Sequence, residues 1–514
     1  MQAVLLILTP LFPALCALLC WFVPALRPDK ARDRFVLASL VASFLLTVAL
    51  CLTGDGSLTL FTISQNLPVV AASDGLSRLF SILMSGMWLL SGAFSFGYMA
   101  HEGAQRRFYT FYLLTLSALL GLCFAGTLVT MYLCFELMTL LSVALVLHSL
   151  TKEAVAAGMK YLLYSIAGAM MGLLGIFFFT ANAVTPLFVP GGTLSPDAVA
   201  SQGPLLLWVL LITVIGFGTK AGMFPMHGWL PTAHPIAPAP ASAVLSGVIT
   251  KAGVLCIIRV IFYVTGADFL RGTWVQTALI MLALITVFMG SMMALKVTVL
   301  KKRLAYSSVS QVSYVLFGLF MLNETAFQGA LLHVYFHSIM KNLLFLCAGG
   351  IILKTGLTDV RDLRGIGKRM PATLWCFTLA GVSLVGVPPL CGFFSKWELQ
   401  GAMASGVAVF SWLGPVVLLV SALLTAGYLL PVSINGFFPG RASGEAALET
   451  SCCELKASML WPLVALAALL LCVPLLFGAT AASDAPSEAP VSRGESFSMG
   501  EYVLDRDDDY FHFS

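Results

Sequence analysis

Fourteen stretches of apolar residues, each about 20 residues long, follow one another along the chain. A helix of that length spans the roughly 30 Å hydrocarbon core of a bilayer. The stretches are continuously apolar, whereas the strands of a membrane barrel alternate polar and apolar positions. The pattern therefore predicts an all-α polytopic membrane protein with about fourteen transmembrane helices. The predicted spans lie near residues 3–24, 35–53, 76–98, 109–126, 128–149, 158–182, 206–226, 239–264, 274–295, 303–322, 327–353, 372–392, 411–435 and 458–478.

The composition agrees with a lipid environment. Hydrophobic residues make up 59% of the chain and charged residues 10%, and the mean hydropathy is +0.94. An ordinary soluble domain carries about 25% charged residues. A chain so poor in charge cannot cover its own surface in water, which excludes a cytosolic enzyme, a secreted disulfide scaffold and a disordered chain. The twelve cysteines form no C-x-x-C pair, so we interpret them as small membrane-core residues rather than zinc or iron–sulfur ligands.

Lysine and arginine are unevenly divided between the two sets of loops. The loops after odd-numbered spans carry eighteen of these cations, and the other side carries four. Cytoplasmic loops hold the excess of positive charge, so both termini are predicted on the non-cytoplasmic side of a cytoplasmic (inner) membrane. The eighteen are Arg27, Lys30, Arg32, Arg34, Arg106, Arg107, Lys152, Lys296, Lys301, Lys302, Arg303, Lys354, Arg361, Arg364, Lys368, Arg369, Arg441 and Lys456. The four are Arg78, Arg271, Arg493 and Arg506.

Ionisable residues also occur inside the predicted spans. A charge at the bilayer centre costs about 2.5–3.5 kcal/mol on insertion scales, and such residues usually mark proton or ion relays. Lys160 and Arg259 lie near helix ends, and we interpret them as snorkelling to the interface. The others are candidates for a proton relay. The full set is Glu136, Lys160, Lys220, Lys251, Arg259, His333, His337, Lys341 and Lys396.

His333, His337 and Lys341 recur at i, i+4 and i+8, which forms a polar stripe about 12 Å long on one helix. Two histidines at this spacing can also bind a metal ion, but no nearby third carboxylate or cysteine ligand is evident in this span. Lysine suits a relay because its charge responds to a neighbouring carboxylate. A buried glutamate favours the protonated ammonium, and withdrawing that glutamate releases the proton.

Two predicted spans are interrupted by proline. Span 7 runs into residues 222–225, and span 12 contains Gly-Val-Pro-Pro at 386–389. Lys220 and Lys396 each lie within about two turns of such a break, where freed carbonyls need neighbours or water. Interrupted segments in corresponding positions indicate inverted repeats. The predicted organisation is spans 1–3 (1–108), a first repeat of spans 4–8 (109–264), a second of spans 9–13 (274–438), span 14 (458–478) and an acidic non-cytoplasmic tail (479–514).

The tail differs in charge from the rest of the chain. Residues 484–514 hold eight acids and two arginines, a net charge of −6, which leaves +10 for the remainder. Such a tail is typical of a solvated segment. Its aromatic residues beside the acids leave docking on a partner as the alternative; they are Tyr510, Phe511 and Phe513.

Motifs spread over most of residues 74–397 resemble those of the antiporter-like membrane subunits of respiratory complex I, membrane-bound hydrogenases and formate hydrogenlyases, and Mrp-type cation/proton antiporters. The matching segments are 74–77 (DGLS), 135–137 (FEL), 218–231 (GTKAGMFPMHGWLP), 233–235 (AHP), 241–259, 304–308 (LAYSS), 333–349 and 392–397 (GFFSKW).

The resemblance implies fourteen helices, the inverted repeat and roles for the buried residues. Glu136 is similar to the span 5 glutamate that pairs with the span 7 lysine, here Lys220. Redox chemistry is expected in other subunits, so no cofactor or metal is expected in this chain. Partners would be other membrane subunits of the same complex, including further antiporter-like subunits, with protons or sodium as the ion and no nucleic acid. The relay residues carried over are Glu136, Lys220, Lys251, His333, His337, Lys341 and the exit lysine Lys396.

The chain departs from the family pattern at two positions: Phe135 stands where tryptophan is common, and Val299 where an acidic residue is common. It also ends after span 14, without the long lateral helix of the largest members, and Lys251 is found in only part of the family. The preferred function is a proton-translocating (or sodium-translocating) subunit of a redox-driven complex. The alternative is a subunit of an Mrp-type antiporter; a stand-alone solute transporter and a passive scaffold fit the buried charges less well.

Overall fold

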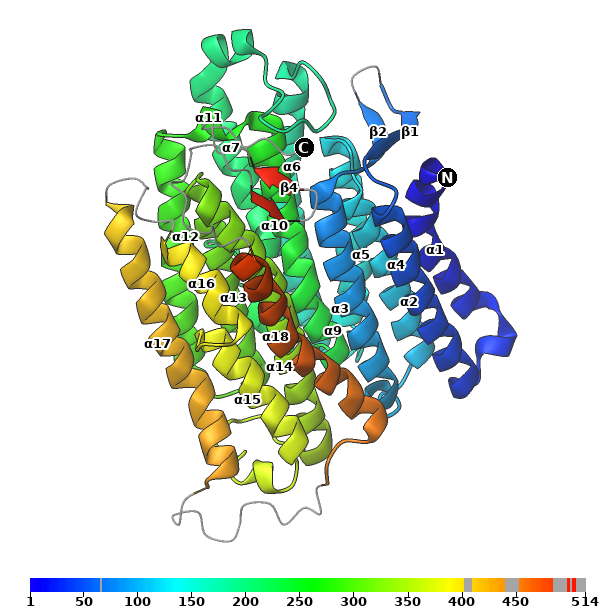
Figure 1. The fold of residues 1–514 in the computed structure, drawn as a ribbon. Helices are drawn as coiled ribbons and strands as arrows, with labels where there is room; N and C mark the ends of the chain where they lie inside the picture. Colours follow the sequence, from blue (N-terminus) through cyan, green and yellow to red (C-terminus); the bar gives the residue numbers. More distant parts are fainter. Residues whose placement is uncertain (65–66, 402–408, 440–452, 484–496, 500–501, 505–514) are drawn as a thin grey trace.

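Long, roughly parallel helices form most of the structure (Figure 1). It is a computed structural model that describes residues 1–64, 67–401, 409–439, 453–483, 497–499 and 502–504. The first helices are α1 (Gln2–Phe22), η1 (Pro24–Leu26), α2 (Asp29–Cys51), α3 (Gly75–Met99), α4 (Gln105–Cys123), α5 (Leu128–Val146), α6 (Lys152–Asn182) and α7 (Pro196–Ala221). Next come α8 (Leu230–Ile236), α9 (Ala239–Val244), η2 (Leu245–Ile249), α10 (Thr250–Ile258), η3 (Arg259–Thr265), α11 (Ala267–Leu270), α12 (Trp274–Lys296) and α13 (Leu300–Phe320). The last are α14 (Glu324–Thr355), η4 (Ile366–Lys368), α15 (Pro371–Val385), α16 (Cys391–Gly401), α17 (Phe410–Phe437) and α18 (Ala457–Ser483).

A helix lies in every predicted apolar window, and ten of the described helices are long and apolar enough to cross a membrane. The chain is therefore a multi-pass, mostly helical integral membrane protein. The other four windows hold α4 and α13, which are more polar, α15 (Pro371–Val385), which is shorter, and α18. The ten are α1, α2, α3, α5, α6, α7, the continuous α9–η3 run, α12, α14 and α17.

Two spans are far more buried than the rest. In the most apolar window of the α9–η3 run every residue is buried, and in α14 the share is 89%, against 33–67% in the other spans. A helix that is buried on all sides belongs in the middle of a bundle. Figure 1 shows α9, α10 and α14 between the N-terminal helices and α15–α17. The most polar stripe predicted from the sequence, on α14, is thus in the core of the bundle.

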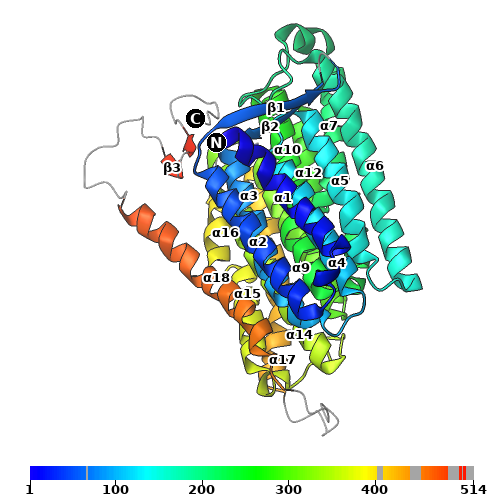
Figure 2. The same cartoon turned by 90° about the vertical axis from the view of Figure 1, so that its right-hand side faces the viewer.

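A β-hairpin that was not predicted from the sequence joins α2 to α3. β1 (Gly56–Thr62) pairs with β2 (Pro68–Ser73) in an antiparallel arrangement that lies across one end of the bundle (Figure 2). The N–H of Ala72 donates to the carbonyl of Phe124 at 2.7 Å, so β2 is held by a segment about 50 residues later. β2 is mostly buried and β1 mostly exposed.

The C-terminal part of the chain is described only in pieces. Helix α18 crosses the bundle obliquely and packs against α3, α14 and α15 (Figure 2). Beyond it, β3 (Phe497–Met499) and β4 (Tyr502–Leu504) pair with each other. The rest of the predicted acidic tail lies outside the described residues.

The helices end where the sequence predicts interruptions. α7 ends at Ala221 and is followed by Gly222 with φ +78°, while α15 ends at Val385 and is followed by Gly386 with φ +96°. Both are left-handed conformations that glycine adopts without steric cost. The indole N–H of Trp229 donates to the carbonyl of Thr219 at 2.8 Å, which adds a side-chain partner to one of the last carbonyls of α7.

Two cations assigned to the cytoplasmic loop after span 9 are instead buried in a helix. α13 begins at Leu300, earlier than predicted, and the side chains of Lys301 and Arg303 are only 6% and 8% exposed. Arg303 donates to the carbonyls of Val297 and Tyr428, each at 2.8 Å. The sequence pattern did not reveal this because a charge run at a helix start resembles a solvated loop.

The interpretation of Arg259 as a snorkelling residue is wrong. Its side chain is 3% exposed and forms a two-contact ion pair with Asp74, at 2.5 and 2.8 Å. Asp74 also caps α3 by accepting the N–H of Ser77 at 2.8 Å. The guanidinium packs over Tyr263, 4.5 Å from the ring centroid. A bidentate ion pair can offset the desolvation of a buried arginine, so the charge is held in the bundle rather than at its surface.

Candidate functional site

Lys220 lies in the last turn of α7 and is completely buried. Its Nζ donates to the hydroxyl of Tyr161 at 2.7 Å and to that of Ser165 at 2.9 Å. The ammonium also lies 4.1 Å from the ring centroid of Tyr161, 5.7 Å from that of Trp229 and 5.9 Å from that of Phe135. Three aromatic faces and two hydroxyls therefore compensate for the loss of water around this charge.

Glu136 lies on α5, one residue beyond Phe135, and is half-buried. Its carboxylate acts electrostatically on Lys220. The two side chains make no direct ion pair in the described part of the chain, and Oε1 of Glu136 has no protein hydrogen-bond partner there. The structure thus shows the span 5 glutamate and the span 7 lysine as separate groups, with the aromatic cage holding the lysine.

Lys251 lies in the bundle core directly after the π-helical turn η2. Its Nζ donates to the carbonyl of Ser246, five residues earlier, at 2.8 Å, and to the hydroxyl of Thr250 at 3.3 Å. It also lies 2.8 Å from Nδ1 of His337 on α14. Single π-turns are frequent at functional sites. Here the π-turn precedes a lysine that reaches the predicted histidine stripe.

His337 and His333 continue from Lys251 along α14. Their rings are stacked, with centroids 5.8 Å apart, and both are fully buried. His333 contacts the hydroxyl of Ser395 through Nδ1 at 2.9 Å and Oε1 of Gln311 through Nε2 at 3.1 Å. Nε2 of His337 has no protein partner in the described residues. The two rings therefore bridge the distance between Lys251 and α16.

Lys396 lies on α16, one residue after Ser395, and is 6% exposed. Its Nζ donates to the carbonyls of Leu384 and Val385 at 2.6 and 3.2 Å. These are carbonyls at the C-terminal end of α15, where a helix leaves acceptors free and favours a cation. The ammonium also lies 5.0 Å from the ring centroid of Tyr314, which stacks on His333. The predicted break in span 12 thus creates the site for this lysine.

Lys341 is fully buried on α14, one turn beyond His337. Its Nζ donates to the carbonyl of Leu304 at 3.1 Å and to the hydroxyl of Ser307, both on α13. It interacts electrostatically with Lys251. The structure therefore brings Lys251, His337, His333, Lys341 and Lys396 into one buried polar group, whereas Lys220 and Glu136 lie in the other half of the bundle.

Lys160, the second cation interpreted as snorkelling, contacts another helix. It lies on α6 and is partly exposed, and its Nζ donates to the hydroxyl of Thr232 on α8 at 3.1 Å.

Several polar residues of the site were not predicted. On α13, Ser307, Gln311 and Tyr314 recur at i, i+4 and i+7 and face α14, so their helical period was a usable signal. Trp229 and Ser395 lay inside motifs already singled out. Tyr161, which holds Lys220, carried no signal, because a single tyrosine in an apolar helix is not distinctive.

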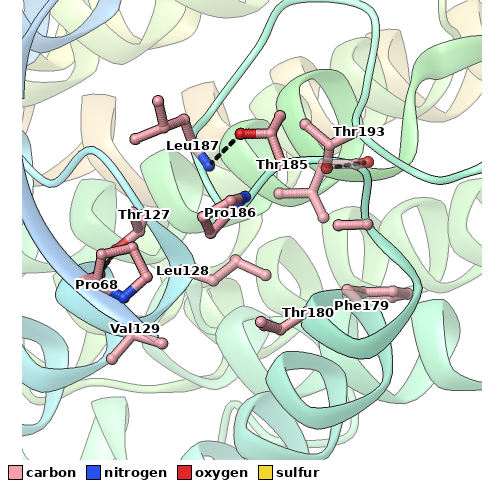
Figure 3. A pocket seen from close by; sticks show the side chains of 12 residues that line it. Pro68, Thr127, Leu128, Val129, Phe179, Thr180, Thr185, Pro186, Leu187 and Thr193 are labelled. Carbon is pink, nitrogen blue, oxygen red and sulfur yellow. Dashed lines mark hydrogen bonds between the residues drawn. The ribbon is translucent and has the colours of Figure 1, made fainter. Parts of the chain in front are cut away.

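A pocket at the end of the bundle near β2 lies apart from this group (Figure 3). Figure 3 shows it lined by side chains such as Pro68, Leu128, Phe179 and Leu187, with several threonines. None of its lining side chains is ionisable, so it offers no group that could load a proton.

Gly253 allows α10 to pack directly on the end of α7. A Cβ atom at this position would lie 2.7 Å from the Ala221 nitrogen, 2.8 Å from the Phe217 carbonyl oxygen and 2.9 Å from Cβ of Lys220. We expect Gly253→Ala to force the two helices apart and to destabilise the protein by about 1–3 kcal/mol, the usual cost of overpacking a well-packed core. The thermal unfolding midpoint of the purified protein measures this.

The matched control is Gly203→Ala, on α7, where a Cβ would meet nothing within 4 Å. It should not lower this midpoint. Equal midpoints of the two variants would show that close packing at Lys220 is unimportant.

Comparisons with known proteins agree with this architecture. Residues 125–425 match the family described as "NADH:quinone oxidoreductase/Mrp antiporter, TM". The N subunit of the NADH-quinone oxidoreductase of Desulforudis audaxviator is 34% identical over 412 residues, covering 76% of this chain and 80% of the relative. A subunit of the Na(+)/H(+) antiporter of Alkalihalophilus pseudofirmus is 28% identical over 441 residues, covering 85% and 86%.

A solved structure shares the fold. A chain of the archaeal membrane-bound sulfane sulfur reductase (MBS), a respiratory membrane complex, aligns with a TM-score of 0.79 at 22% identity, over 93% of this chain and 96% of that one. The protein therefore belongs to the NADH:quinone oxidoreductase/Mrp antiporter family of membrane proteins. The resemblance found in the sequence motifs is confirmed, and these relatives are subunits of multisubunit membrane complexes.

Proposed function

We propose that this chain is a proton-translocating subunit of a redox-driven membrane complex of the NADH:quinone oxidoreductase or membrane-bound hydrogenase type. One observation carries the proposal: a series of buried ionisable groups runs from Lys251 through His337 and His333 to Lys396. A passive scaffold gains nothing from such charges in the bundle core. Electron transfer, with its cofactors, belongs to partner subunits, which include further antiporter-like subunits.

The proposed arrangement in the membrane follows from the charge distribution. Fourteen spans cross a cytoplasmic membrane, both termini lie outside the cytoplasm, and the end of α3 and the start of α13 face the cytoplasm. The two inverted repeats are residues 109–264 and 274–438. Spans 1–3 (1–108) precede them, and span 14 (458–478) and the tail (479–514) follow. The helix ends at Ala221 and Val385 support the repeat, because each lies close to a buried lysine.

In the first repeat, Glu136 controls the charge on Lys220. Moving the carboxylate toward the lysine stabilises the ammonium, and moving it away releases a proton. The hydroxyls nearest to Lys220 supply a path for that proton: Tyr161 accepts from the lysine at 2.7 Å and lies 2.8 Å from the hydroxyl of Ser142. The unpartnered Oε1 of Glu136 is free to exchange partners during such a movement.

From the end of the first repeat into the second, the proton passes from Lys251 to Nδ1 of His337, at 2.8 Å. A water molecule between the two stacked imidazoles carries it to His333, because Nε2 of His337 has no protein partner in the described chain. The hydroxyl of Ser395 then leads from His333 toward Lys396, the next residue, and the ring of Tyr314 packs against both groups. Lys341, which acts electrostatically on Lys251, loads and releases a proton in turn with it as a member of the relay.

The second candidate function is a subunit of an Mrp-type cation/proton antiporter without a redox partner. It is favoured by the extended similarity to the Na(+)/H(+) antiporter of Alkalihalophilus pseudofirmus, which covers 85% of this chain. The same relay would then exchange protons against sodium rather than follow electron transfer.

The test uses the whole complex, purified through a tag on this chain and sealed into liposomes. With NADH and a quinone present, or with a low-potential electron donor suited to a hydrogenase, a redox-driven complex acidifies the lumen, measured with a pH-sensitive dye. An antiporter instead dissipates an imposed pH gradient when sodium is added, without any electron donor. Redox-driven sodium uptake with no proton movement would assign the relay to sodium. Absence of all three responses would overturn both candidate functions.

A further inference from the structure

Asn342 lies on α14 directly after Lys341 and is completely buried. Its Oδ1 accepts a hydrogen bond from the hydroxyl of Ser91 on α3 at 2.7 Å. Its Nδ2 donates to the carbonyl of Ser338, one turn earlier on α14, at 2.9 Å. Because a carbonyl can only accept, this second contact fixes which side of the amide carries the nitrogen. The proton path proposed above makes no use of this amide.

The amide of Asn342 packs directly on the π-turn η2. A Cβ atom on Gly247 in that turn would lie 2.1 Å from Nδ2 of Asn342 and 2.8 Å from its Cγ. Real Cβ atoms do not approach a neighbour so closely, so glycine lets the amide lie against the backbone of the turn. Helices α3 and α14 both pack on η2. The amide therefore fills the space in which these three elements meet.

The turn is also held by α13. The hydroxyl of Ser246, in η2, lies 2.6 Å from the hydroxyl of Ser308. The carbonyl of Ser246 accepts from Nζ of Lys251 at 2.8 Å. The same Nζ lies 2.8 Å from Nδ1 of His337 on α14. The place of η2 between α13 and α14 therefore sets the distance between the ammonium and the imidazole.

Asn342 and His337 lie five residues apart on the same helix. The amide that touches the turn and the imidazole that receives the proton are thus parts of one rigid element. A movement of η2 away from α14 would lengthen the separation between Lys251 and His337. Proton transfer between two side chains requires a separation close to hydrogen-bond length.

We propose that Asn342 is the positioning residue of the proton transfer between Lys251 and His337, and that Ser91 on α3 orients its amide for this task. This inference rests on the proposed translocation and adds a dependence on α3 to it. Asn342 exchanges no proton itself and acts only through the place of η2. A movement of α3 would turn the amide and thereby change the rate of this step.

The first test exchanges bulk across the contact and measures ion translocation by the whole complex in sealed vesicles. Gly247→Ala should slow translocation roughly tenfold or more, because the methyl pushes η2 off the amide and a ~1 Å misplacement can cost about 10²-fold. The double variant Gly247→Ala/Asn342→Ala should be faster than either single variant, since the methyl then occupies the space of the amide. If Gly247→Ala does not assemble, a double variant no faster than Asn342→Ala overturns the proposal.

The matched control for the glycine is Gly381→Ala. Gly381 is buried in α15, and a Cβ there would meet the side chain of Leu429 at an ordinary contact distance of 3.7 Å. This variant should translocate as the wild type does.

Two further variants only remove atoms. Asn342→Ala should translocate on the order of tenfold more slowly, because η2 loses its support. Ser91→Ala should be slower by roughly fivefold, the worth of one ordinary hydrogen bond. Ser85→Ala is the control: this serine is also buried on α3, and its hydroxyl donates to carbonyls of α3 itself. It should behave as wild type.

The solvent deuterium isotope effect separates a positioning role from a structural one. When the distance between Lys251 and His337 grows, their proton transfer becomes the slow step, so the isotope effect on translocation should rise in the slow variants. A structural defect instead lowers the amount of intact complex and leaves the isotope effect unchanged. Wild-type rates in both Asn342→Ala and Ser91→Ala would overturn the proposal, as would slow rates with an unchanged isotope effect.

Lys251→Met judges the proposed function separately in the same vesicles. If it fails to translocate while the Asn342 and Ser91 variants are normal, translocation stands and only the positioning role falls. If Lys251→Met itself translocates normally, the step from Lys251 to His337 is not part of the path, and the positioning role falls with that step.

Discussion

Replacing Lys341 by methionine should reduce ion translocation by roughly 100-fold or more, the range expected when a positioned proton-transfer group is lost. The side chain is fully buried, and its Nζ donates only to Leu304 and Ser307 in the described structure. Methionine has a similar length and fills the same space. Because a buried charge already costs insertion energy, its removal should not unfold the bundle. Lys220→Met and Lys396→Met should have effects of the same order.

Ion uptake and electron transfer should be measured together on the assembled complex in sealed vesicles. Electron transfer should slow as well, because a coupled machine cannot turn over freely when one proton step is blocked. Lys152→Met is the control, since Lys152 is exposed at the start of α6. Normal pumping in all three central lysine variants would remove the relay and leave a scaffold role.

The second large effect concerns stability. Asp74→Asn should destabilise the protein by about 3 kcal/mol, the lower end of the range for breaking a buried ion pair. The lower end applies because the Asp74 side chain is 30% exposed, whereas that of Arg259 is 3% exposed. Arg259 would keep its contact with Ser77 but lose the carboxylate that balances its charge. Asparagine still accepts a hydrogen bond at the start of α3, so the cap itself is largely retained.

The yield of assembled complex and its thermal unfolding midpoint report this change. Arg259→Met should be less harmful, since it leaves the more exposed partner of the pair. The double variant Asp74→Asn/Arg259→Met should recover part of the loss, as no buried charge remains. A double variant that is no better than Asp74→Asn would show that the ion pair is not the cause.

The sequence alone predicts the features that depend on the residues of one continuous segment. Apolar windows locate the helices because lipid requires about 20 apolar residues for each crossing. Glycine and proline at 222–225 and 386–389 locate the two helix ends, since they act on the local backbone. The stripe His333, His337 and Lys341 follows from the helical period. Motif similarity identified the family.

Contacts between distant segments could not be predicted in this way. Arg259 was interpreted as snorkelling, because its partner Asp74 lies 185 residues away. The aromatic cage of Lys220 takes one ring from each of three separate segments, and none of these rings is distinctive by itself. Lys301 was placed in a loop, although packing against the end of α8 buries it.

The sequence by itself therefore determined which segments must lie in lipid and which charged residues cannot face lipid. Only the tertiary structure decided how each charge is compensated. Lys396 is held by α15 carbonyls that the break in span 12 sets free, Lys251 by a π-turn and a histidine on another helix, and Lys220 by aromatic faces. The physical reason is that a buried charge needs partners in three dimensions, whereas hydrophobicity acts residue by residue along the chain.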